Sequence, residues 1–173
     1  TTPSSAITAV MTGAIPRAVT GRGTGLDDPA WTRKILVIER ALAVNQPDPN
    51  DPLGVLTALG GLEIAALVGA MLGAARCRVP VVLDGFISGA AALIAVGLES
   101  SLRGYLLASH RSVEPGHALA LDRLGLKPLL ELDLRLGEGT GAALAIGILD
   151  AAVKIVNEMA TFHEAGVSER ADP

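Results

Sequence analysis

The sequence has few aromatic side chains and one cysteine. Among its 173 residues there are two Phe, one Trp and one Tyr, although 50% of the residues are hydrophobic. The core must therefore be built from Leu, Ala, Val and Ile, which suits close packing of helices on a sheet. The lone Cys77 excludes an internal disulfide and fits a reducing compartment. We expect a cytoplasmic protein.

Basic stripes and long uncharged runs are also missing. Fourteen Lys and Arg against eighteen Asp and Glu give a net charge of −4, which disfavours a nucleic-acid surface. Glu63, Asp84 and Asp150 interrupt the apolar runs before any reaches the roughly 18–20 uncharged residues of a spanning helix. The start lacks the basic and apolar regions of a signal peptide. We expect no nucleic-acid and no membrane partner.

Helix and loop signals alternate in the first third of the chain. Thr2-Pro3 is typical of a helix start and predicts a helix over residues 3–12, with Thr2 as its N-cap. Residues 20–28, TGRGTGLDD, are a glycine-rich loop. Pro29 opens a second helix with apolar residues at three- and four-residue steps, and NQPDPNDP at 45–52 ends it.

A strand–turn–helix unit follows in the middle of the chain. A helix is predicted over 62–76, with Gly69 and Gly73 spaced to let another backbone approach closely. Residues 79–83 read as a strand that is buried on both faces, as in a parallel sheet. An acid–glycine turn then leads into a helix over 86–98.

Strands and helices continue to alternate towards the end. We expect a strand at 105–108, a polar loop at 109–112, a helix at 114–124, a strand at 129–134 and a last helix at 139–162. This alternation predicts an α/β fold, a Rossmann-like parallel sheet flanked by helices. Ligands of such sheets lie at the carboxyl ends of the strands.

Polar residues collect at that predicted edge. They are Asp84, the SHRS segment at 109–112 and the GEGT segment at 137–140. Helix starts and glycine-rich turns bind anions, so Thr1-Thr2-Pro3, the GRGTG loop, Ser112 and the GEGTG turn together favour a phosphorylated ligand. Each of them alone is better explained as a turn or a helix cap.

Individual side chains leave two interpretations open. Glu138 is a general base if burial beside Leu136 and Ala142 raises its pKa, or it is an acid that caps the following helix. Lys34 is a phosphate partner or a solvated surface lysine. Asp84 orients a ribose hydroxyl or caps the helix that starts near Phe86.

Signatures of metal and nucleotide sites are absent from the sequence. His110, His117 and His163 have no metal-ligand spacing with Cys77 or with any carboxylate cluster. GRGTGL is not a GxGxxG fingerprint, and no P-loop or GxSxG elbow occurs. We expect no metal and no cofactor. A generic nucleotide-binding α/β domain is disfavoured for the same reason.

Four long segments resemble one known family. NQPDPNDP, GGLEIAALVGAMLGAARCRVPVVLDGFISGAAAL, SHRSVEPGH and LRLGEGTGAALA are similar to the carboxyl-terminal half of nicotinate-nucleotide–dimethylbenzimidazole phosphoribosyltransferases. The match runs from Thr1 to about Met159 without an insertion. The resemblance implies transfer of phosphoribose from nicotinate mononucleotide to 5,6-dimethylbenzimidazole, which gives α-ribazole phosphate, for the lower ligand of cobalamin, and nicotinate.

The resemblance also implies roles for particular residues. Glu138, in the family's GEG[ST]G segment, is the expected catalytic base. The expected phosphate ligands are Lys34, Ser112, Thr1 and Thr2. We place Asp84, Gly137 and Gly139 near the ribose. Residues 1–138 are expected to belong to the α/β domain, and residues 139–173 to contribute to a small helical domain.

The family's amino-terminal half has no counterpart in this sequence. We therefore expect a carboxyl-terminal portion that binds substrate weakly alone and turns over slowly or not at all. The family implies a homodimer. The alternative is a non-catalytic carboxyl-terminal fragment that serves binding or dimer assembly, in which Glu138 only caps a helix.

Overall fold

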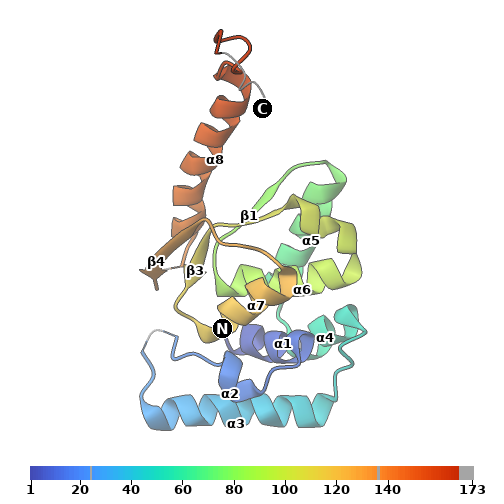
Figure 1. Cartoon of the computed structure of the whole chain (residues 1–173). Helices are drawn as coiled ribbons and strands as arrows, with labels where there is room; N and C mark the ends of the chain where they lie inside the picture. Colours follow the sequence, from blue (N-terminus) through green and yellow to red (C-terminus); the bar gives the residue numbers. More distant parts are fainter. Residues whose placement is uncertain (24, 136, 168–173) are drawn as a thin grey trace, which may run out of the picture.

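The structure is a computed structural model that describes residues 1–23, 25–135 and 137–167. The described residues form a mostly helical α/β arrangement with two small parallel sheets (Figure 1). The elements are α1 (Thr2–Thr12), α2 (Pro16–Val19), α3 (Asp28–Asn45), α4 (Pro52–Leu59), α5 (Leu62–Arg76), β1 (Val81–Leu83), α6 (Phe86–Leu98), the 3-10 helix η1 (Ser100–Tyr105), β2 (Leu106–Ala108), β3 (His110–Ser112), α7 (Pro115–Leu124), β4 (Leu130–Leu134) and α8 (Thr140–Glu158).

Helix α6 lies at the centre of the core. It packs against α1, α4, α5 and α7, and Ala90, Ala91, Ala92, Ile94 and Ala95 are all 0% exposed. A helix that is apolar on every side is stable only when neighbours cover it all round. Its small side chains let those neighbours approach closely. The core is built mainly from Leu, Ala, Val and Ile, as predicted, and it also contains Phe86, which is 4% exposed.

The strands form two short ribbons instead of one large sheet. β1 pairs in parallel with β2, and β3 pairs in parallel with β4. Between β2 and β3, the Ser109 N–H donates to Leu83 O, while Ser109 O accepts from the Leu130 N–H. The chain therefore changes partner at a single residue. The predicted polar loop at 109–112 is mostly strand β3, and the predicted sheet with helices on both faces is not formed by the described residues.

Other predictions for the middle of the chain need correction. The bounds of α5 and α6 are those predicted. The strand predicted at 79–83 begins two residues later, and it is not buried on both faces because Val79 is 51% exposed. A Cβ placed on Gly69 or Gly73 would meet no heavy atom of the described chain within 4 Å. The predicted close approach therefore does not occur within this part of the chain.

The helix ends at the two extremes of the chain also differ from prediction. Thr1, not the predicted Thr2, is the N-cap residue of α1, and it makes no side-chain hydrogen bond there. Helices α2 and α4 are additional to the predicted elements. Helix α8 ends at Glu158, before the predicted residue 162.

Helix α8 projects away from the other helices (Figure 1). Val156 is 82% and Met159 68% exposed. Among the described residues, α8 alone is long and apolar enough to cross a membrane, and only 11% of its most apolar window is buried. Length and composition are weak evidence for a span, and the helix carries an Asp150–Lys154 pair at 3.8 Å.

Candidate active site

A cavity of about 370 Å³ opens where the predicted polar edge meets the start of α1. Its walls come from the start of α1, the loop before α3 and α3 itself, the β1–α6 connection with the start of α6, strand β3 with the turn before α7, and the segment that follows β4. The lining residues are Thr1, Thr2, Arg22, Gly23, Leu26, Lys34, Asp84, Gly85, Phe86, Ile87, His110, Ser112, Glu114, Arg135 and Gly137.

One side of this pocket, which we call the lysine end, is built around Lys34. Its Nζ donates to Thr1 Oγ1 and to Gly21 O, both at 3.1 Å. Burial lowers the pKa of Lys34, because the ammonium loses water, and the nearby Glu114 carboxylate opposes this shift. The ammonium is thus held in place by the protein and faces an open cavity.

A glycine loop completes the lysine end. Glu114 Oε1 accepts from the Gly23 N–H at 3.0 Å, and a Cβ on Gly21 would overlap Glu114 Oε2. Among the described residues, that Oε2 atom is buried without a hydrogen-bond partner. Arg22 pairs with Asp28 and stacks on the Trp31 ring, its guanidinium carbon 5.1 Å from the ring centroid. Gly21 therefore leaves the space that the Glu114 carboxylate occupies.

Ser112 enters the lysine end from β3 and is supported by a buried histidine. The Ser112 N–H donates to His117 Nδ1 at 3.0 Å, and Ser112 Oγ accepts from the Glu114 N–H at 3.3 Å. Burial, with His110 and Arg111 nearby, lowers the pKa of His117 to about 4. His117 is therefore neutral at pH 7 and accepts through Nδ1. The Ser112 hydroxyl keeps its hydrogen for a ligand.

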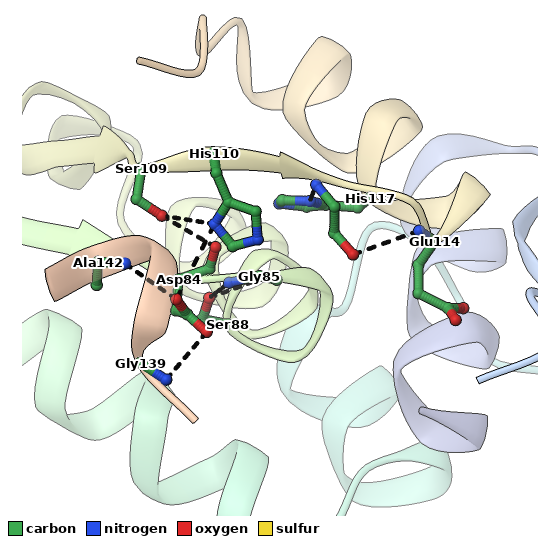
Figure 2. Close-up of polar contacts among 10 residues, drawn as sticks. Asp84, Gly85, Ser88, Ser109, His110, Glu114, His117, Gly139 and Ala142 are labelled. Carbon is green, nitrogen blue, oxygen red and sulfur yellow. Dashed lines mark hydrogen bonds and ion pairs between the residues drawn. The ribbon is translucent and has the colours of Figure 1, made fainter. Parts of the chain in front are cut away.

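The opposite side, which we call the turn end, consists of Asp84, Ser109, His110 and residues 137–142. Asp84 Oδ2 accepts from the Gly139 N–H at 3.2 Å, and Asp84 Oδ1 accepts from the Ala142 N–H at 3.0 Å (Figure 2). Asp84 therefore caps α8, 55 residues further along the chain, and not the helix near Phe86. In α6 the Gly85 N–H is instead accepted by Ser88 Oγ at 3.1 Å.

His110 is the second support of the turn end. Ser109 Oγ donates to Asp84 O at 3.0 Å and lies 3.0 Å from His110 Nδ1. Since the hydroxyl has one hydrogen, His110 Nδ1 carries the proton in that contact. The ring is 2% exposed, and a Cβ on Gly141 would overlap it.

Glu138 is part of the turn end and directly follows the pocket-lining Gly137. Its φ is +63°, which is uncommon for a residue with a side chain and costs roughly 1 kcal/mol or more. Glu138 is exposed, so the burial beside Ala142 that one of the two interpretations assumed does not occur; Leu136 lies outside the described residues. The carboxylate that caps this helix start in the described chain is that of Asp84.

Most residues predicted for the site meet in one place. Lys34, Ser112, Thr1, Thr2, Asp84 and Gly137 line the pocket, and Glu138 and Gly139 follow at its edge. Arg111 points elsewhere and pairs with Glu131 at 3.2 Å.

Several lining residues were not predicted from the sequence, among them Arg22, Glu114 and Arg135. Arg135 lies near the GEGT turn in sequence and Glu114 lies near Ser112, and this proximity was the available signal.

Within the described ranges, no three His, Cys, Asp or Glu side chains are grouped so that they could hold a metal ion.

Comparison with known proteins identifies a family that this chain matches along nearly its whole length. A family model described as Phosphoribosyltransferase matches residues 1–167. The chain is 62% identical over 170 residues to the nicotinate-nucleotide–dimethylbenzimidazole phosphoribosyltransferase of Chloroflexus aggregans, covering 98% of this chain and 48% of that protein. The protein of the same name from Syntrophobacter fumaroxidans is 60% identical over 169 residues, with the same coverage.

A solved structure agrees with these relatives. The crystal structure of CobT from Thermus thermophilus superposes with a TM-score of 0.91 at 48% identity, covering 98% of this chain and 50% of that one. The chain thus spans about half the length of the curated relatives and of the solved structure it matches.

Proposed function

This chain belongs to the phosphoribosyltransferase family, and we propose that it supplies the lysine end and the catalytic turn of a nicotinate-nucleotide–dimethylbenzimidazole phosphoribosyltransferase. The reaction transfers phosphoribose from nicotinate mononucleotide to 5,6-dimethylbenzimidazole for the lower ligand of cobalamin. The observation that carries the proposal is a single pocket in which a half-buried lysine, a serine hydroxyl and the glutamate-bearing turn meet.

The phosphate of the mononucleotide binds at the lysine end. A phosphate oxygen can take the place of Thr1 Oγ1 and Gly21 O as acceptor for Lys34 Nζ, and a charge-assisted bond is stronger than those neutral contacts. The Ser112 hydroxyl donates to the same group, and Thr1 and Thr2 complete it. The lowered pKa of Lys34 reflects burial that such an anion would offset.

Glu138 acts as the general base at the turn end. One benzimidazole nitrogen attacks C1′ of the ribose as the bond from C1′ to the nicotinate nitrogen breaks, which inverts the anomeric centre. The electron pair of that bond leaves with nicotinate. The other benzimidazole nitrogen becomes strongly acidic once its ring is alkylated and gives its proton to the Glu138 carboxylate.

Asp84, Gly137 and Gly139 belong to the turn end, and the ribose of the bound mononucleotide lies beside them in this scheme. Positioning of a phosphate at one end and of a base at the other brings the reacting atoms together without a covalent intermediate. The residues of this chain supply binding and proton transfer and require no resident cofactor in this scheme.

The remainder of a relative's chain would complete the fold. Further strands could extend the two short ribbons into the Rossmann-like sheet, with residues 1–138 in that domain and residues 139–173 in a helical one. We also propose a cytoplasmic homodimer. The exposed apolar side chains of α8, such as Val153 and Val156, favour a contribution to assembly in addition to catalysis.

A chimera tests the proposal. Residues 1–173 replace the matching segment of the Chloroflexus aggregans enzyme, and nicotinate release and α-ribazole phosphate formation are measured for the chimera and for this chain alone. We expect turnover by the chimera and little or none by the chain. A folded chimera that forms no product would refute the proposed function, and rapid turnover by the chain alone would refute its dependence on the part of the relatives that this chain does not match.

A further inference from the structure

Among the described residues, the turn that carries Glu138 and the start of α8 contact the carboxylate of Asp84 and the imidazole ring of His110. Figure 2 shows Asp84 reaching Gly139 and Ala142, while Ser109 and His110 lie on the other side of Asp84. Both carboxylate oxygens are occupied by backbone N–H groups at 3.2 and 3.0 Å. A carboxylate in this place also complements the positive end of the α8 helix dipole.

These contacts leave Asp84 poorly suited to bind a ribose hydroxyl strongly. If Asp84 also accepted a hydrogen bond from a ribose hydroxyl, that bond would compete with the two hydrogen bonds that its oxygens accept from backbone N–H groups at the start of α8. The group connected most closely to Asp84 is instead the backbone of Gly139, the residue after Glu138. A displacement of Asp84 would therefore move Glu138 before it affected the ribose.

His110 fixes the same turn by shape. The ring lies against the backbone of Gly141, where a Cβ would overlap it, and Nδ1 is 4.0 Å from Asp84 Oδ1. Ser109 Oγ joins the two by bonding Asp84 O and His110 Nδ1, each at 3.0 Å. The start of α8 thus rests on a carboxylate that holds its N–H groups and a buried ring that fills the space beside it.

We propose that Asp84 and His110 are positioning residues that hold the Glu138-bearing turn at the pocket, Asp84 by capping α8 and His110 by packing against Gly141. This inference rests on the proposed role of Glu138 as base. It assigns Asp84 a function different from ribose binding. The exposed, left-handed Glu138 has little packing of its own, so its position depends on these neighbours.

Asp84→Asn is the first test. The amide places an N–H donor where one backbone N–H now finds an acceptor, with almost no change of volume. In the chimera we expect kcat to fall at least tenfold, since a displacement on the order of 1 Å can cost about 100-fold, and KM for nicotinate mononucleotide to stay within about twofold. A rise in KM with unchanged kcat would identify a ribose ligand and overturn the proposal.

Hydrogen exchange tests the attachment without any turnover. In the chain itself, Asp84→Asn should speed amide exchange at Gly139 and Ala142, while exchange in α6 keeps its native rate. Unchanged exchange at both amides would overturn the capping role even if the chimera were inactive. An inactive native chimera with faster exchange in the variant would instead refute only the proposed function.

Gly141→Ala tests His110 independently and does not require an Asp84 variant to fold. It should lower kcat at least tenfold, whereas the matched control Gly147→Ala, on the same helix with no atom within 4 Å of the added Cβ, should leave kcat unchanged. Combining Gly141→Ala with His110→Ala should remove most of the effect of the added methyl group. An equal loss of kcat from Gly141→Ala with and without the ring would overturn the packing role.

Discussion

The two ends of the pocket are held together in different ways. At the lysine end, a charged side chain donates to a hydroxyl and a carbonyl, and a glycine loop is fixed 91 residues away by Glu114. At the turn end, a carboxylate accepts from backbone N–H groups and the glutamate itself is exposed. At the lysine end, the protein already holds the group that would bind a ligand. At the turn end, the backbone is held while the Glu138 side chain is exposed. Substitutions should therefore change binding at the first end and turnover at the second.

Glu138→Gln gives the largest expected effect. The amide cannot accept the benzimidazole proton as a base, and general bases contribute roughly 100- to 10,000-fold. In the chimera, kcat should fall by about that factor while KM for nicotinate mononucleotide stays unchanged. Glu158→Gln, at the carboxyl-terminal end of α8, is the control. A kcat within threefold of the parent would show that Glu138 is not the general base and would contradict the assignment of turnover to the turn end.

Lys34→Ala should act on binding. Loss of a hydrogen bond to a charged group costs about 1.5–3 kcal/mol, so KM for nicotinate mononucleotide should rise roughly 10- to 100-fold. Isothermal titration of the chimera with the mononucleotide measures the same loss directly. Arg40→Ala, exposed on α3, should change neither value. Unaltered affinity in Lys34→Ala would place the phosphate elsewhere.

Acid should loosen the lysine end through His117. Its pKa is about 4 in the fold, against 6.5 ordinarily, so the unfolded chain takes up the proton first as pH falls. The stability that depends on a neutral His117 is therefore complete above pH 6.5. The free energy of unfolding should drop by about 2 kcal/mol between pH 7 and 5. Below that range a protonated Nδ1 can no longer accept from Ser112.

Urea unfolding at both pH values measures this loss. His117→Asn, which keeps an acceptor but does not titrate, should show a smaller loss than the native chain, and His163→Asn should behave like the native chain. Equal pH dependence in His117→Asn and the native chain would contradict this reading of His117.

Gly21→Ala should have the smallest effect. The added methyl group displaces the Glu114 carboxylate and breaks its bond to the Gly23 N–H. Because the displaced group is the end of a flexible side chain, we expect KM for nicotinate mononucleotide to rise only about 3- to 10-fold, on the scale of one hydrogen bond. Gly104→Ala, where a Cβ has open space, is the control. A larger change in kcat than in KM would show that the glycine loop affects turnover, which would contradict the assignment of the lysine end to binding alone.

The two ends also differ in how far the sequence predicts them. Turn chemistry and apolar periodicity locate α5, α6 and the polar residues after the strands, since these signals are local. Residues from all three polar segments of the predicted edge line the pocket. The bond from Asp84 to Gly139 joins residues 55 positions apart, and no local pattern indicates which of several helix starts an aspartate will cap.

The same limit explains the errors in the sheet and at Glu138. Ser109 changes strand partner because of where the Leu83 and Leu130 backbones lie, which periodicity does not report. The apolar Ala142 suggested burial of Glu138. Ala142 lies in α8, however, whereas Glu138 has a φ of +63° and is exposed in the turn before that helix. Gly137 and Gly139 marked a turn without giving its direction.

A crystal structure of the chimera with nicotinate mononucleotide bound would test the division of the pocket most directly. We predict that the phosphate lies within hydrogen-bond distance of Lys34 Nζ and Ser112 Oγ, with the ribose directed towards Glu138 and the bonds from Asp84 to α8 intact. A phosphate bound at the α8 N-terminus, with Asp84 displaced from Gly139 and Ala142, would contradict it.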